Sequence, residues 1–169
     1  MQAEAPGLHG RASQWYEDHG LEIEAFQHAV AADDIQRAER LLGGTGIPRH
    51  FRGATTTILR WLASLSPTVL NARPALWWRH AWLLLTTGQP SGVEEKLQAA
   101  EAALAQMGPD TEQDEQTRTL IGQIAAARAV LAVTRYQAET MHAQARRALL
   151  YPLPDNLAVR TSAPWSLAL

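Results

Sequence analysis

The stretch from Arg73 to Met107 constrains the fold most, because it reads as two helices joined by a short turn. Pro74 suits the first helical position, where its missing N–H is not needed. Gly88 is placed to end the first helix, since glycine adopts the left-handed C-terminal conformation without a Cβ penalty. Pro90 is expected to open the second helix. Apolar and small residues recur every three or four positions, so the sequence predicts an antiparallel hairpin whose apolar stripe needs neighbouring helices.

The order of large, small and turn residues in this hairpin resembles a tetratricopeptide repeat. It is carried by Trp77, Ala81, Leu84, Gly88, Val93, Leu97 and Ala100. The same template recurs 48 residues later, at Ala125, Ala129, Ala132, Tyr136, Met141, Ala145 and Ala148. This offset exceeds the roughly 34 residues of the regular repeat, and Tyr136 stands at the position of the turn glycine. The resemblance implies an all-α fold, a right-handed α–α superhelix of tetratricopeptide-like helical hairpins.

Helices are also expected along the rest of the chain, and no segment is a plausible strand. Asp33 and Asp110 are the expected N-caps of two of them, because each is followed three positions later by a glutamine that can complete a capping box. Residues 43–53 are rich in glycine and predict an irregular loop. A last helix is expected to begin near residue 156. We therefore expect residues 1–169 to form a single helical-repeat domain, a fragment of a longer solenoid whose C-terminal helix is truncated after 156.

Composition argues against several classes of protein. A net charge of −2, a pI near 6.3 and scattered basic residues argue against direct nucleic-acid binding. The chain has no cysteine, which excludes disulfides and thiolate chemistry and is compatible with a cytoplasmic location. The most apolar run, residues 75–85, is short and contains Arg79 and His80, so we expect no transmembrane helix.

No sequence motif for catalysis, a cofactor or a metal is found. Residues 43–50 lack the G-x-x-x-x-G-K-[ST] spacing and the lysine of a phosphate loop. None of the six histidines is paired at i, i+4 with another histidine or with a suitable carboxylate cluster. No G-x-S-x-G nucleophile elbow is present, and Glu94 and Glu95 read as solvated surface. We therefore expect a protein without catalytic, cofactor-binding or metal-binding residues.

The first helix of the central hairpin carries three tryptophans. Trp77 is expected to face the partner helix, whereas Trp78 and Trp82, four residues apart, lie on a different stripe. In tetratricopeptide arrays the first helices line the concave face, and flat aromatic faces beside polar groups suit sugars and other amphipathic ligands. The candidate groove for an effector or partner comprises Trp78, Trp82, Leu85, Gln123, Ala126, Ala127 and Val130.

Each of these residues also has a purely structural explanation. Both tryptophans on the second stripe can instead pack on the preceding helix, around Leu62 and Leu65, in which case they are core residues. Arg79, Arg128 and Arg135 can serve an anionic ligand or a peptide, but an arginine is more often simply solvated.

The order of phrases along nearly the full chain resembles the sensor region of MalT-like transcriptional regulators, the large ATP-binding regulators of the LuxR type. The phrases that carry the resemblance are RASQWYEDHG at residues 11–20, EAFQHAVAADD at 24–34 and LRWLASLSPTVLNARPAL at 59–76. Such regulators contain a nucleotide-binding switch module, a helical-repeat sensor and a C-terminal helix-turn-helix. The resemblance implies that this chain is the first half of the sensor. The glycine-rich segment at 43–53 departs from the family, in which this part is usually a continuous helix.

The resemblance also implies a function. The chain would be a non-catalytic sensor domain that binds an effector molecule or a protein partner. It would relay this binding to the ATPase and DNA-binding modules of the parent regulator, which lie outside the chain. The alternative is a generic tetratricopeptide-type scaffold for a protein partner, without a small-molecule ligand.

Overall fold

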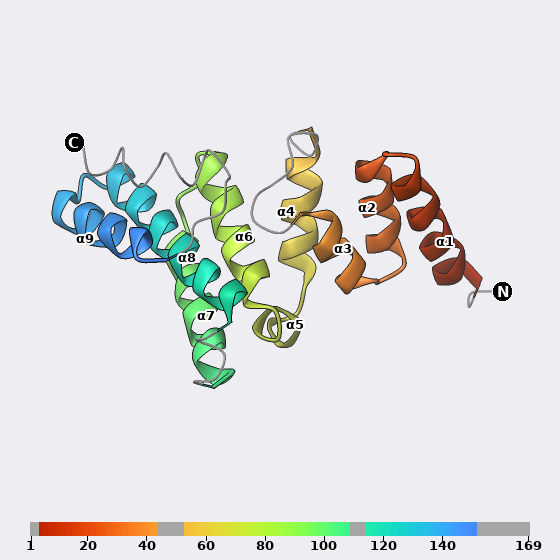
Figure 1. The fold of residues 1–169 in the computed structure, drawn as a ribbon. Coiled ribbons are helices and arrows are strands. Elements are labelled where there is room, and N and C mark those ends of the chain that lie inside the picture. Colours follow the sequence, from red (N-terminus) through yellow and green to blue (C-terminus); the bar gives the residue numbers. More distant parts are fainter. Residues whose placement is uncertain (1–3, 44–52, 109–113, 152–169) are drawn as a thin grey trace. The chain divides into compact units, whose positions relative to one another are not determined.

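A computed structural model describes residues 4–43, 53–108 and 114–151. Within these ranges all regular structure is helical (Figure 1), so the all-α prediction is confirmed there. The helices are α1 (Glu4–Asp18), α2 (Glu22–Ala31), α3 (Ile35–Leu41), α4 (Thr55–Ser64), α5 (Pro67–Asn71), α6 (Pro74–Thr86), α7 (Val93–Gln106), α8 (Glu115–Thr134) and α9 (Ala138–Leu149). Most of the expected loop and the helix expected from residue 156 lie outside the described residues.

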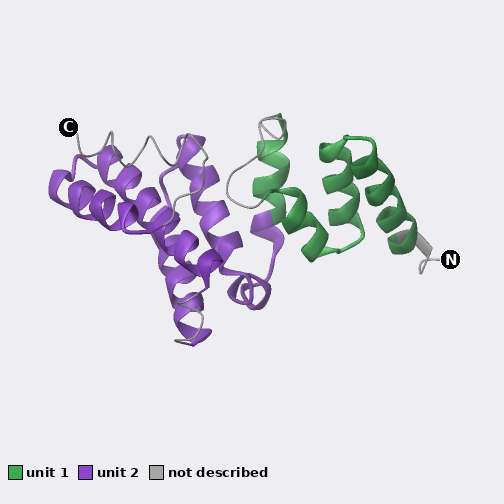
Figure 2. Ribbon diagram, in the orientation of Figure 1, with its two compact units in different colours: residues 1–61 green, residues 62–169 purple. Residues whose placement is uncertain are grey.

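The chain divides into two compact units, residues 1–61 and 62–169 (Figure 2). The sequence predicted a single helical-repeat domain, and nothing in its periodicity marks the boundary, which lies within α4. The first unit contains α1, α2, α3 and the start of α4, and the second contains α5 to α9. Each unit has buried apolar residues of its own and is described by itself.

In the first unit, α2 packs against both α1 and α3. Ala25, Phe26 and Ala29 of α2 are fully buried, and the Phe26 ring meets Trp61 edge to face with the ring centroids 5.4 Å apart. The buried hydroxyl of Ser13 on α1 donates to the carbonyl oxygen of Ala25 at 2.8 Å. Because two of these three buried α2 residues are alanines, the neighbouring helices can approach closely and bury a small but dense core.

In the second unit, α6 and α8 are the most enclosed helices. α6 packs against α5, α7 and α8, and α8 packs against α6, α7 and α9. Residues 122–127 of α8 are all buried, and because six consecutive residues cover the whole circumference of a helix, this part of α8 lies inside the core. Its buried alanines are Ala125, Ala126, Ala127, Ala129 and Ala132. The hairpins α6–α7 and α8–α9 therefore share one apolar cluster.

Four helices among the described residues end in the same backbone turn. A residue with positive φ follows the helix, its N–H bonds to the carbonyl three residues back, and the next N–H bonds to the carbonyl five residues back. This is the Schellman motif, which satisfies carbonyls left free at a helix C-terminus. The left-handed residues are Gly20, Asp33, Gly88 and Tyr136, with φ of 71°, 57°, 72° and 55°. Tyr136 thus takes the conformation of the turn glycine that it replaces.

Three expected helix starts are corrected by the structure. Asp33 occupies the left-handed corner, so the cap shifts by one residue to Asp34, whose carboxylate accepts the Arg37 N–H at 3.0 Å. Pro90 lies in the turn, because α7 begins only at Val93. Asp110 is outside the described residues, and the observed cap of α8 is Asp114, which accepts from the Thr117 N–H at 3.1 Å.

Candidate functional site

The predicted groove residues lie on two helices that pack together, α6 and α8. Trp78 and Trp82 are stacked, with ring centroids 6.0 Å apart and an interplanar angle of 16°. Both belong to the apolar cluster of the second unit, together with Ala126, and the half-buried Leu85 and Val130 pack against this cluster. Gln123 is buried on α8. The residues that the sequence analysis grouped together are therefore neighbours in the fold.

The exposure of these residues differs from the prediction of an open groove. Trp78 is 2% exposed and Trp82 is 8% exposed. They are enclosed in a cluster to which α7 contributes Leu97 and α8 contributes Ile124. The physical reason is that α6 is covered on several sides, so its second stripe meets α8 instead of solvent. The two indoles are core residues, and the solvent-accessible part of the predicted set is formed by Leu85 and Val130. Effector binding at these positions stays a prediction.

Trp77, expected to face the partner helix, packs against the apolar cluster that contains residues of α7. Trp77 is only half-buried, and its indole Nε1 donates to the side-chain oxygen of Asn71 at 3.0 Å. Trp78, in contrast, is enclosed, and its Nε1 has no hydrogen-bond partner within the described part of the chain. A buried donor without a partner costs free energy. The α6 indole that the sequence assigned to the partner helix is thus the most solvated of the three.

His80 is a buried titratable group that sequence reasoning missed as such. It is 9% exposed on α6, and burial, followed by the nearby Lys96 charge, lowers its pKa to about 4. Its imidazole is therefore neutral near pH 7. Its neighbour Arg79, expected to be solvated, is 4% exposed. The sequence indicated this burial only in one way: Arg79 and His80 interrupt the apolar run at residues 75–85. Polar residues within such a run lie on a helix that has little polar surface.

Arg128 of α8 and Glu101 of α7 together connect three helices of the second unit. The Arg128 guanidinium donates to Glu94 of α7 at 3.1 Å and to Glu101 of α7 at 2.7 Å, and Arg147 of α9 reaches Glu101 at 3.4 Å. Burial alone would lower the pKa of Arg128, but its hydrogen bonds to Glu101 and Glu94 outweigh this and raise it. Glu94, expected to be solvated surface, is half-buried and paired with Arg128, whereas its neighbour Glu95 is exposed as expected.

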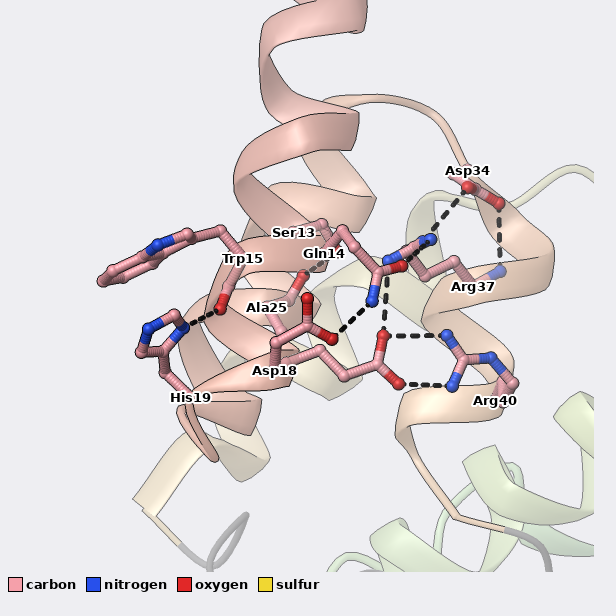
Figure 3. A network of polar contacts seen from close by, with 10 residues as sticks. Ser13, Gln14, Trp15, Asp18, His19, Ala25, Asp34, Arg37 and Arg40 are labelled. Atoms are coloured by element: carbon pink, nitrogen blue, oxygen red, sulfur yellow. Dashed lines mark hydrogen bonds and ion pairs between the residues drawn. The ribbon is translucent and has the colours of Figure 1, made fainter.

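A second polar network links α1 to α3 in the first unit (Figure 3). Glu17 of α1 forms ion pairs with Arg37 and Arg40 of α3. The hydrogen bond from Arg40 lowers the pKa of Glu17, against the opposing effect of burial. Gln14 accepts from Arg37 at 2.8 Å and donates to Asp18 at 2.7 Å. This network is saturated by its own members, so it reads as a structural connection between helices.

Large apolar side chains remain accessible at the outer surfaces of both units. In the first unit Trp15 is 53% exposed, and its ring stacks on His19 with centroids 4.0 Å apart. In the second, Tyr136 is 97% exposed at the α8–α9 corner. Tryptophan and tyrosine are the residue types that contribute most often to protein interfaces. Both units therefore keep a large aromatic side chain accessible to solvent.

Two features are absent from the described residues. No group of three or more histidine, cysteine, aspartate or glutamate side chains there is arranged to hold a metal ion. In the same residues no helix has both the length and the apolar character needed to cross a membrane.

The fold and its surfaces define a class: a helical protein built from paired, closely packed helices. No family model matches the chain, and no solved structure matches it. It is similar to the serine/threonine-protein kinase PknK of two strains of Mycobacterium tuberculosis and one of Mycobacterium bovis. The identity to each is 32% over 99 residues, which is 57% of this chain and 9% of the relative. The chain thus spans about a tenth of the length of the curated relatives that it matches.

Proposed function

We propose that this chain is a non-catalytic helical-repeat sensor domain of a bacterial MalT-like regulator of the LuxR type. In this proposal it acts in the cytoplasm, where it binds an effector or a protein partner. Binding changes how the repeats pack, and this change is relayed to ATPase and DNA-binding modules of the parent protein.

The packing of the second unit is the observation that carries the proposal. The first helix of the second hairpin, α8, packs against both helices of the first hairpin, α6 and α7. This is how consecutive hairpins of a tetratricopeptide-like superhelix bury a continuous core. The corners at Gly88 and Tyr136 also share one turn, although the residues differ. A repeated packing unit of this kind supports an array that can extend and present a long binding surface.

The comparisons give a second line of support. A segment of 99 residues matches only 9% of each relative, so those relatives are about ten times longer than the matched segment. A segment that is similar to a small part of a large signalling protein fits a module that serves other modules. The kinase activity named for the relatives is not proposed here, since the chain contains neither the H-R-D nor the D-F-G motif of a protein kinase.

The alternative function is a tetratricopeptide-type scaffold that binds a protein partner and has no small ligand. The exposed Trp15 and Tyr136 favour this alternative, because both are large aromatic side chains that a partner could cover. The burial of Trp78 and Trp82 removes two aromatic faces that a small effector was expected to use.

A thermal-shift screen tests the proposal. The purified chain is melted with a panel of sugars, amino acids, nucleotides and other metabolites, because a ligand that binds only the folded state raises the melting temperature. A saturable increase with one chemical class supports a sensor. A Leu85→Ala or Val130→Ala variant that weakens the effect would place the ligand at the accessible edge of the α6–α8 cluster.

The coding sequence on either side of this segment provides an independent test. A phosphate-loop module encoded upstream and a helix-turn-helix encoded downstream would support the regulator. Their absence, combined with no ligand in the screen and saturable binding of a protein partner that Trp15→Ala or Tyr136→Ala weakens, would favour the scaffold instead.

A further inference from the structure

The outward side of α1 carries a stripe of exposed apolar and charged side chains. Four exposed residues follow one another there at spacings of three and four positions, which places them on the same side of the helix. They form what we call the α1 face, Leu8, Arg11, Trp15 and Asp18. The opposite side of the helix meets α2 through the buried Ser13. Two large apolar side chains of α1 are thus left in solvent by the described residues of this unit.

Trp15, at the centre of the α1 face, is exposed but restrained. Its ring stacks on His19, with an interplanar angle of 26°, and meets the Tyr16 ring edge to face with centroids 5.2 Å apart. The His19 Nδ1 atom donates to the Trp15 carbonyl oxygen at 2.7 Å, which fixes the imidazole beside the indole. Figure 3 shows Trp15 and His19 on the side of α1 away from Arg37 and Arg40. A side chain that is already held in place loses little entropy on binding, and tryptophan is enriched among the residues that dominate interface energy.

The charges of the α1 face are arranged so that the face is complementary to itself. Arg11 and Asp18 lie equally far from a midpoint between Trp15 and the residue before it. A second α1 that lies antiparallel, with a two-fold axis through this midpoint, places each Arg11 opposite Asp18 of the second copy. The same axis brings the two Trp15 indoles together at the centre. Leu8 and the exposed Leu21 are also equally far from the midpoint, so each end of the pair gains an apolar contact.

Both charged groups are available for such pairs. Arg11 has no ion pair within the part of the chain that the structure describes. The Asp18 carboxylate accepts one hydrogen bond, from the Gln14 Nε2 atom at 2.7 Å. A carboxylate offers about four acceptor positions, so it can also accept from an arginine. An interface between two identical copies requires this self-complementarity, which favours a second copy over an unrelated protein as the occupant.

We propose that the α1 face binds a second copy of this chain as an antiparallel helix pair. The two Trp15 indoles supply most of the affinity, and the two Arg11–Asp18 pairs fix direction and register, since exposed charges contribute specificity more than affinity. The 15 residues of α1 span roughly 22 Å, so the contact is at the small end of protein interfaces and the dissociation constant falls in the micromolar range. This self-association does not depend on the sensor function proposed above.

Sedimentation velocity of the full chain, at concentrations between about 1 µM and about 1 mM, tests for the dimer. The weight-average mass should rise with concentration from 18.6 kDa toward twice this value. Trp15→Ala should weaken dimerisation by at least about tenfold. Tyr136→Ala also removes an exposed aromatic side chain, but in the second unit, so it is the matched control and should leave dimerisation unchanged.

Two charge-reversal variants test the antiparallel register. Arg11→Glu places two carboxylates opposite each other at both contacts, and Asp18→Arg places two guanidinium groups there. Each variant alone should therefore dimerise at least about tenfold more weakly than the wild type. An equimolar mixture of the two variants restores opposite charges at both contacts and should recover dimer formation. Because the mixture contains only variant chains, this recovery also shows that both variants are folded.

Three results would overturn the proposal. A chain that stays monomeric over the whole concentration range leaves the α1 face to a different protein. A dimer that Trp15→Ala does not weaken uses another surface. A mixture of the two charge-reversal variants that dimerises no better than either variant alone contradicts the antiparallel pairing.

Discussion

Trp78 and Trp15 are two tryptophans with opposite surroundings, and they provide a matched test at the scale of the residue. Trp78 is 2% exposed in the core of the second unit, whereas Trp15 is 53% exposed on α1. Trp78→Ala removes a large buried side chain and leaves a cavity, so it should cost about 3–5 kcal/mol in the free energy of unfolding. Trp15→Ala should change it by less than about 0.5 kcal/mol. Urea denaturation measures both values, and equal losses would contradict the burial described here.

His80 makes stability depend on pH in a defined window. Its pKa in the folded chain is about 4, below the ordinary value of 6.5 expected after unfolding. Between these values the unfolded chain binds a proton that the folded chain does not, so stability falls as the pH drops from 6.5 toward 4 and is unaffected above 6.5. The loss should be roughly 1–3 kcal/mol.

The variant His80→Leu removes this titrating group. Urea denaturation at several pH values should then give a flatter dependence between pH 4 and 6.5 than the wild type shows. An unchanged slope in the variant would mean that His80 is protonated equally in the folded and unfolded chain.

The burial of individual residues was predicted well where a helix has a single apolar stripe. It was predicted poorly on α6, which has two apolar stripes that neighbouring helices could cover. Ala81, a small residue of the repeat template, is fully buried. Trp77 and Trp78 are adjacent, and helical periodicity placed them on different stripes without indicating which one the neighbouring helices cover. Neighbouring helices bury the stripe of Trp78 and Trp82, so the prediction that these two indoles are open to solvent was wrong. That information lies in the packing of helices far apart in the sequence, which no local pattern contains.

At the scale of the element, the left-handed corner residues give the clearest prediction. Tyr136 has φ of 55° and is 97% exposed, so its side chain is not supported by packing. A non-glycine residue in this conformation carries about 1–2 kcal/mol of strain. Glycine relieves this strain, but its greater conformational entropy in the unfolded chain cancels part of the gain. Tyr136→Gly should therefore raise the free energy of unfolding by up to about 1 kcal/mol, measured by urea denaturation.

Gly88 provides the reverse substitution at the equivalent corner of the first hairpin. It has φ of 72°, and a Cβ added there would meet no atom within 4 Å, so Gly88→Ala introduces backbone strain without a steric clash. The alanine variant should lose about 1 kcal/mol. If both substitutions changed stability in the same direction, the two corners would not share one conformation.

The carboxylates of α7 test the connection between α7 and α8. Glu94 pairs with Arg128, which is only 13% exposed, whereas Glu95 is exposed. Glu94→Gln weakens a charge-assisted hydrogen bond to a largely buried guanidinium and should cost about 1–2 kcal/mol. Glu95→Gln changes the same charge in solvent and should be nearly silent. Thermal unfolding at low and high salt compares them, and equal shifts would contradict the assignment of Arg128 as an internal connection.

Helix positions were largely predictable, and helix starts were not. Pro74 opens α6 as expected, because a first-turn proline is local chemistry. Ser66 caps α5 by the same kind of local chemistry. The cap of α3 shifted from Asp33 to Asp34 because the two helices share one tight corner, in which the first aspartate must turn the chain. Competition between two adjacent aspartates is decided by the path of the chain, and the capping pattern alone does not resolve it.

At the scale of the whole molecule, the helical class followed from periodicity, whereas the division at residue 61 did not. Periodicity reports which face of each helix is buried and is silent on which helices bury one another. The two units therefore became visible only from contacts between helices distant in sequence. The superhelical arrangement of the whole chain stays a prediction.

The last prediction concerns the whole chain: it should neither hydrolyse ATP nor bind DNA specifically. Its single lysine, Lys96, is within α7, where the ammonium lies 3.5 Å from the Gly92 carbonyl oxygen, and no glycine-rich phosphate loop precedes it. The net charge of −2 also provides no favourable field for phosphates. A phosphate-release assay and fluorescence anisotropy with duplex DNA at physiological salt measure the two activities. Lys96→Gln is the control, and an ATPase rate that this variant shares with the wild type indicates a contaminant. Turnover that is abolished by this or another substitution in the chain would refute a non-catalytic role.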